Sequence, residues 1–135
     1  MYTREVILME KQTLTIQSEC DDLLLSVAMF VPDGEVKGIF QIAHGMAEHK
    51  ERYEEFMKYL ASQGYVTLIH DHRGHGASVK SEGDLGYFYD NRAEHIIEDL
   101  HQVARHAKSL YPNQPLTLFG HSMGALVVRK YIKKI

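Results

Sequence analysis

The sequence predicts an α/β fold in which a mostly parallel sheet of about five strands carries helices on both faces. Short apolar runs with little polar alternation occur at 39–43, 65–69 and 116–119, as expected of parallel strands that are buried on both faces. Segments with helical periodicity separate these runs. Because successive parallel strands are joined by crossovers of one hand, this alternation predicts helices on both faces of the sheet.

Two further strands precede these runs and are expected to form an antiparallel pair. Leu14 and Ile16 alternate with polar residues, and every second residue from Leu23 to Val31 is apolar. Such alternation is typical of strands with one buried face. The polar segment 18–22 connects the two strands, and the turn-forming residues 32–34 end the second one.

Three amphipathic helices are predicted between and after the central strands. Gly64 is placed to end the first in a left-handed cap. Asn91 is a candidate N-cap of the second, with Glu94 three residues further on, and Pro112 prevents its continuation. The third begins after Ser122. The apolar faces consist of Tyr53, Phe56, Met57 and Leu60 in the first helix, Ile96, Ile97, Leu100, Val103, Ala104, Ala107 and Leu110 in the second, and Leu126, Val127, Tyr131, Ile132 and Ile135 in the third.

Length and composition favour a single domain and exclude several classes of partner. A chain of 135 residues is long enough for one hydrophobic core. The formal net charge of −3 lacks the basic excess of a nucleic-acid-binding domain. Cys20 is the only cysteine, so no intrachain disulfide can form and a reducing compartment is expected. No segment reads as a signal peptide or a membrane span, so we expect a cytoplasmic protein without stable membrane insertion.

A possible nucleophile lies between the last predicted strand and the last predicted helix. Residues 120–124 read Gly-His-Ser-Met-Gly, a G-x-S-x-G motif in which a sharp strand-to-helix turn raises the central serine at the carboxyl edge of the sheet. Gly120 and Gly124 are needed because the tight turn leaves no room for side chains. Ser122 is therefore the candidate nucleophile. The Met123 backbone N–H, at a helix N-terminus, is positioned to stabilise an oxyanion.

A second loop, directly after the strand 39–43, complements this motif. It begins with His44 and Gly45, and the Met46 backbone N–H is the candidate for a second oxyanion donor. His44 is also compatible with a core histidine that is hydrogen-bonded to backbone groups.

The histidine-rich segment that follows the strand 65–69 allows a metal-binding interpretation. His70 and His72 would face the same way on a strand, and His75 could complete a zinc site. However, the usual pattern H-x-H-x-D-H requires an acid where this chain has Gly74. A hydrogen-bonded turn is the favoured interpretation, and neither a metal nor another cofactor is expected.

Together these motifs resemble one branch of a known superfamily. Residues 44–53, 71–78 and 120–124 are similar to the H-G-x-G-E-H-x-x-R-Y, D-x-R-G-H-G-x-S and G-H-S-M-G blocks of the monoacylglycerol lipase and lysophospholipase-like α/β-hydrolases, the serine aminopeptidase-type branch. Ala47 departs from the glycine that is usual there. The resemblance implies that Ser122 is the nucleophile, that Met46 and Met123 donate to the oxyanion, and that His44, Gly45, Gly120, His121 and Gly124 support them.

The resemblance also implies a catalytic acid and a catalytic histidine, and residues 1–135 include neither at the expected place after Ser122. Family members carry them after the serine, whereas residues 123–135 include no Asp, Glu or His, and all nine histidines precede Ser122. His121 is a poor candidate base because adjacent residues on an elbow point in different directions. His44 and His75 are conceivable surrogates at the same sheet edge, but a general base must lie within hydrogen-bond reach of the serine.

We therefore expect residues 1–135 to form the N-terminal half of an α/β-hydrolase domain. Two functions remain open at this stage. One is a serine esterase acting on lipid-like or small esters, fatty-acid esters of glycerol or lysophospholipid above all, with an apolar acyl site lined by Met46, Met123 and Phe88. The other is a non-catalytic half-domain. In either case the strand 116–119 would expose an apolar edge, which favours self-association or pairing with a missing C-terminal half.

Overall fold

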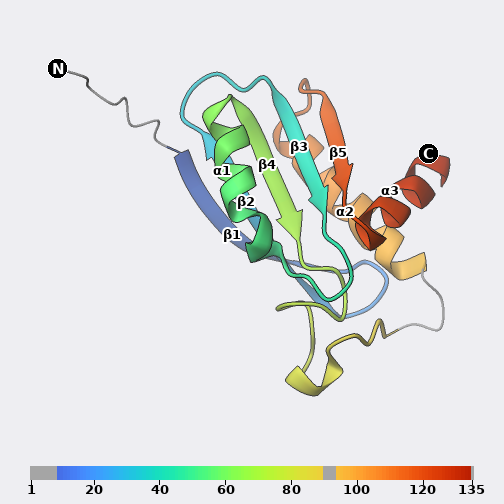
Figure 1. The fold of residues 1–135 in the computed structure, drawn as a ribbon. Coiled ribbons are helices and arrows are strands. Elements are labelled where there is room, and N and C mark those ends of the chain that lie inside the picture. Colours follow the sequence, from blue (N-terminus) through green and yellow to red (C-terminus); the bar gives the residue numbers. More distant parts are fainter. Residues whose placement is uncertain (1–8, 90–93, 135) are drawn as a thin grey trace.

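The computed structural model describes residues 9–89 and 94–134, which form a five-stranded sheet between helices (Figure 1). The strands lie in the order β1-β2-β4-β3-β5. Their bounds are Met9–Gln17 for β1, Leu24–Pro32 for β2, Gly38–Ala43 for β3, Tyr65–His70 for β4 and Leu116–Gly120 for β5. All five predicted strands are confirmed.

The sheet is mixed, with a parallel part that carries the candidate motifs. β1 and β2 form the predicted antiparallel pair, from Met9 opposite Pro32 to Gln17 opposite Leu24. β2 is also antiparallel to β4, which the sequence pattern does not reveal. β4, β3 and β5 are mutually parallel. Their carboxyl ends therefore meet at one edge of the sheet, where Ala43 lies opposite Gly120.

One face of the sheet is covered by a single helix. A short 3-10 turn, η1 (Lys50–Tyr53), leads into α1 (Glu54–Ser62). Met57 and Ala61 of this helix are buried against the side chains that β2, β3 and β4 direct to this face. Gly64 follows α1 with φ of 99°, a left-handed conformation that glycine adopts without strain, which confirms the predicted cap.

The opposite face carries the two longer helices, α2 (Glu94–Leu110) and α3 (Met123–Lys134). α2 ends before Pro112 as predicted, whereas its candidate cap Asn91 lies outside the described residues. The side chains along β2 alternate between the two faces of the sheet. Val27 and Met29 lie on the face that α2 covers and pack with this helix. None of the described helices has the length and apolar character needed to cross a membrane.

The exposed side of β5 leaves apolar surface uncovered. Among the described strands β5 pairs with β3 alone, so one of its edges is open. On the α1 face, Phe119 packs against the rings of Phe40 and Phe56 yet remains 36% exposed. On the other face, Leu126 and Ile132 of α3 are 60% and 53% exposed. Apolar side chains on both faces of the sheet are therefore partly exposed near the open edge of β5.

Candidate active site

Ser122 lies at a strained turn between β5 and α3. Its φ is 57°, a left-handed conformation that costs a residue with a Cβ about 1–2 kcal/mol. The turn is close to the neighbouring strand, because a Cβ added to Gly124 would collide with the Ala43 carbonyl. A Cβ on Gly120 would lie 2.7 Å from the backbone of Ala125. The structure thus explains both glycines of the motif and leaves the serine exposed.

The first turn of α3 leaves one backbone donor available beside the serine. The N–H of Gly124 donates to the His121 carbonyl at 2.9 Å, and that of Ala125 donates to the Ser122 carbonyl at 3.0 Å. The Met123 N–H donates to none of the residues that the structure describes. An unpaired N–H at a helix N-terminus is suited to bind an oxyanion.

The loop after β3 approaches this elbow closely. A Cβ built on Gly45 would lie 3.2 Å from the Ser122 Cβ, so glycine is required for the approach. Within the described segments, the Met46 N–H has no acceptor. The two predicted donors are thus both free, on loops that converge beside the serine.

Ala47 has an unusual backbone conformation in this loop. Its φ is 61°, in the region that glycine occupies without cost. This conformation is consistent with the glycine that is usual at this position of the resembling family, and here alanine adopts it.

Glu48 braces the loop, a role that sequence reasoning missed. One carboxylate oxygen, Oε1, accepts the Gly45 N–H at 2.6 Å and the Tyr53 hydroxyl at 2.8 Å. The other oxygen forms an ion pair with Arg52 at 2.7 Å. Burial favours the neutral acid, but the hydrogen bonds from Tyr53 and Gly45 outweigh it and lower the pKa of Glu48. Burial and the bond to Glu48 raise the pKa of Tyr53 to about 12.

His44 is a buried structural histidine. Its Nε2 accepts the backbone N–H of His72 at 3.0 Å, so the proton resides on Nδ1, which donates to the Gly45 carbonyl at 2.8 Å. Both nitrogens are therefore engaged, and His44 cannot take a proton from Ser122. The Nδ1 of His75 lies 3.2 Å from the Arg73 carbonyl, and His121 lies 3.4 Å from Glu48. None of these histidines contacts the Ser122 hydroxyl.

The segment after β4 forms a hydrogen-bonded turn. The Asp71 carboxylate accepts the Lys50 N–H at 2.7 Å, the Lys50 ammonium at 3.0 Å and the Ala77 N–H at 3.0 Å. His70 and His72 are fully buried and their rings lie 5.1 Å apart. In residues 9–89 and 94–134, no group of three or more potential ligands is arranged to hold a metal ion. The predicted hydrogen-bonded turn is confirmed.

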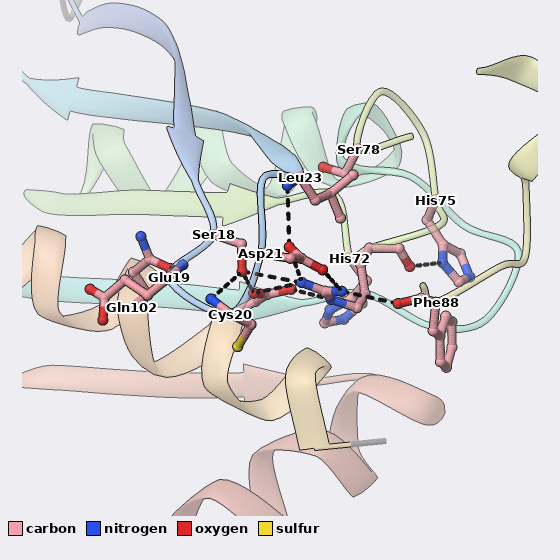
Figure 2. Close-up of polar contacts among 12 residues, drawn as sticks. Ser18, Glu19, Cys20, Asp21, Leu23, His72, His75, Ser78, Phe88 and Gln102 are labelled. Carbon is pink, nitrogen blue, oxygen red and sulfur yellow. Dashed lines mark hydrogen bonds and ion pairs between the residues drawn. The ribbon is translucent and has the colours of Figure 1, made fainter. Parts of the chain in front are cut away.

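Arg73, at the centre of the same turn, is completely buried. Its guanidinium makes an ion pair of 2.7 Å with Asp99 of α2 and one of 2.9 Å with Asp21 of the β1–β2 turn. It also donates to the Ser18 hydroxyl at 3.1 Å and to the Phe88 carbonyl at 3.0 Å. Ser18 and Asp21 of the β1–β2 turn and Phe88 of the segment before α2 converge on this centre (Figure 2).

The electrostatics of this centre are reciprocal. Hydrogen bonds from Arg73 lower the pKa of Asp21. Burial opposes the charge on Arg73, but its carboxylate partners overcome that cost and raise the pKa of the guanidinium. Sequence reasoning placed Arg73 in a family block but could not find partners that are 26 to 55 residues distant.

Two apolar hollows adjoin the site, and they divide the predicted acyl-site residues between them. A hollow of about 470 Å³ lies beside the oxyanion loop and is lined by Met46, Ala47, Glu48, His75 and Leu85 among others. Phe88 and Met123 line a separate hollow of about 220 Å³ on the α2 and α3 face. Within the described residues the three candidate acyl-site residues therefore do not line one common hollow.

A serine on a strand-to-helix elbow, with free N–H groups on two loops at the carboxyl edge of a largely parallel sheet, defines the α/β-hydrolase class. The family model described as "Serine aminopeptidase, S33" matches residues 34–135. The chain belongs to this hydrolase family.

The sequence is similar to enzymes named for monoglycerides. It is 34% identical over 103 residues to monoglyceride lipase of Homo sapiens, covering 71% of this chain and 30% of that protein. The corresponding figures for the monoacylglycerol lipase of Mycolicibacterium smegmatis are 32% identity, 76% and 35%. The chain thus spans about a third of the length of these relatives.

Solved structures share the fold over nearly the whole chain. A carboxyl esterase from Bacillus coagulans, determined with glycerol, matches with a TM-score of 0.83 and 31% identity over 90% of this chain and 39% of the esterase. A monoglyceride lipase from Saccharomyces cerevisiae matches with a TM-score of 0.67 and 25% identity, covering 91% and 38%.

We predict that removal of the Arg73 guanidinium destabilises the fold strongly. The substitution Arg73→Met leaves the buried Asp99 carboxylate without its partner, which costs about 3–5 kcal/mol in the free energy of unfolding. Arg105→Met is the matched control, because Arg105 pairs with Glu19 at an exposed position and costs less than about 1 kcal/mol. Urea unfolding followed by circular dichroism measures both, and equal losses would contradict the assignment.

The buried histidines predict acid destabilisation. Burial lowers the pKa of His70 from 6.5 to about 3, and burial also lowers the pKa values of His44 and His72. The unfolded chain therefore binds more protons than the folded one below pH 6.5. The contribution of the neutral histidines to the free energy of unfolding is fully present above this pH. It is lost as the pH decreases, by up to about 1.4 kcal/mol per pH unit for each histidine.

The measurement is the free energy of unfolding in urea at pH values from 7 to 5. His70→Gln should reduce the slope of this free energy against pH, because it removes one of the buried histidines. A stability that does not vary over this range would show that the histidines are not buried in neutral form.

Proposed function

We propose that this chain carries the nucleophile and the oxyanion hole of a serine esterase that hydrolyses carboxylic esters of the monoacylglycerol or lysophospholipid type. The observation that carries the proposal is the exposed Ser122, held at φ of 57° next to two loops whose Met46 and Met123 N–H groups are free among the described residues. This is the arrangement that acyl transfer through a serine requires.

In the proposed reaction the Ser122 hydroxyl oxygen attacks the ester carbonyl carbon while its proton passes to a base. The carbonyl oxygen becomes an oxyanion and accepts hydrogen bonds from the Met46 and Met123 N–H groups. Collapse of the intermediate breaks the bond to the alcohol, which leaves with a proton, and forms an acyl ester on Ser122. Water then attacks this ester and releases the acid and the free serine.

The acid and base are proposed to come from polypeptide outside these 135 residues. In this fold they follow the serine on later strands, and none of residues 123–135 can serve. Without a base the hydroxyl is a weak nucleophile. The isolated chain should therefore react slowly, and catalysis should require the remaining part of an α/β-hydrolase domain.

The substrate class is inferred from relatives and from the surface. The similar proteins include a monoglyceride lipase and a probable lysophospholipase L2. The mostly apolar hollow next to Met46 is compatible with a lipid chain or a glycerol ester beside the oxyanion loop.

A chimera tests the activity. Residues 1–135 replace the matching part of human monoglyceride lipase, and a fluorophosphonate probe is applied to this protein and to the isolated chain. We expect rapid labelling of Ser122 in the chimera, slow labelling in the chain and none in Ser122→Ala forms. A chimera that folds, as judged by circular dichroism, but is not labelled at Ser122 would refute the proposed function.

We also propose that the open edge of β5 is the surface on which the rest of the domain assembles. Phe119, Leu126 and Ile132 leave apolar area exposed on both faces at this edge, and the carboxyl esterase and the yeast monoglyceride lipase are each more than twice as long as their matched part. An unpaired strand with such flanks adds a further strand readily.

In the isolated chain only a second copy can occupy this edge, so we expect concentration-dependent dimers in sedimentation experiments. Phe119→Lys should shift the chain to monomer because a lysine on the edge opposes pairing. Leu24→Lys, at another exposed apolar position, is the matched control and should still dimerise. A chain that is monomeric at every concentration would contradict the assembly surface.

A further inference from the structure

We propose that Glu48 is a positioning residue that fixes the direction of the Met46 oxyanion donor by clamping Gly45 from both sides. The inference rests on the proposed function, because it assigns the Met46 N–H to the oxyanion, but the clamp itself is a property of the folded chain. The Glu48 side chain is only 10% exposed, so the hydrogen bonds of its carboxylate are shielded from water.

The clamp uses both the backbone and the side chain of Glu48. The carboxylate accepts the Gly45 N–H at 2.6 Å, and the Glu48 backbone N–H donates to the Gly45 carbonyl at 3.3 Å. The same carbonyl accepts Nδ1–H of His44 at 2.8 Å. The peptide groups on either side of Gly45 are therefore held.

The position of the Met46 donor follows from peptide geometry. The Gly45 carbonyl and the Met46 N–H belong to one planar trans peptide, so they point in opposite directions. Because the carbonyl is turned inward to His44 and Glu48, the N–H of Met46 is turned away from them and stays unpaired among the described residues. Rotation of this peptide would remove the donor.

Glu48 also connects the loop to its surroundings. Tyr53, which precedes α1, donates to the same carboxylate oxygen at 2.8 Å and so ties the loop to the helix. His121, the residue before the nucleophile, lies 3.4 Å from that oxygen. The Glu48 carboxylate therefore connects the loop after β3 with the start of α1 and with the elbow. A carboxylate suits this position because it only accepts hydrogen bonds and presents several lone pairs to converging donors.

The test compares Glu48→Ala and Glu48→Gln with Glu55→Ala, which removes an equal charge from the exposed surface of α1. Amide hydrogen exchange by NMR is measured on the 135-residue chain. We expect Gly45 to exchange at least about tenfold faster in Glu48→Ala, because its N–H loses its acceptor. Glu48→Gln retains an acceptor oxygen and should restore most of the protection, and Glu55→Ala should have no effect.

A second readout separates positioning from general stability. In the wild-type chain the Gly45 amide proton resonance should titrate with the Glu48 carboxylate in the acid range, and this titration should vanish in Glu48→Gln. The rate of Ser122 labelling by fluorophosphonate should fall at least about tenfold in Glu48→Ala, since one oxyanion donor is misdirected.

Unchanged exchange and titration of Gly45 in the Glu48 variants would overturn the clamp. If these two signals respond as expected but no protein is labelled at Ser122, the clamp stands and the proposed function fails. If the signals respond and labelling of Ser122 is equally fast in Glu48→Ala, the clamp does not position the donor and the inference fails.

Discussion

The rest of the structure depends on the ion pairs and hydrogen bonds that the buried guanidinium of Arg73 makes. It joins the β1–β2 turn, the loop after β4, the segment before α2 and α2 itself through Asp21, Phe88 and Asp99. From this loop the His72 N–H bonds to the His44 ring, which in turn holds the Gly45 carbonyl. A continuous series of polar contacts and backbone links thus extends from α2 to the Gly45–Met46 peptide.

This arrangement allows strained residues to persist at the candidate site. Ser122 and Ala47 both have positive φ, each at a cost that unconstrained chain would avoid by relaxing. The contacts of Gly45 with the elbow and the hydrogen bonds of Glu48 leave no room for such relaxation. Among the described residues the Met123 N–H has no acceptor because it lies at the start of α3, and the Met46 N–H has none because its peptide turns the Gly45 carbonyl toward His44 and Glu48.

Local pattern was sufficient to predict the strands, the helices and the elbow, because each depends on periodicity and on glycines at recognisable positions in the sequence. It also placed Ser122 on the elbow between β5 and α3, with Met46 and Met123 as the proposed backbone donors beside it. It could not identify Asp99 and Asp21 as the partners of Arg73, because these ion pairs exist only after distant segments pack. For the same reason it could not show that Phe88 and Met46 line different hollows. The role of Glu48 was easier to predict from the sequence, because Glu48 lies three residues from Gly45 in the recognisable block 44–53.

The most direct measurement of the central claim is a crystal structure of the phosphonylated chimera. The phosphoryl oxygen of the adduct represents the oxyanion of the tetrahedral intermediate. We expect phosphorus to be bonded to Ser122 Oγ and the phosphoryl oxygen to lie about 2.7–3.1 Å from the backbone nitrogens of both Met46 and Met123. An adduct whose phosphoryl oxygen points away from these two nitrogens, or is held by other groups, would contradict it.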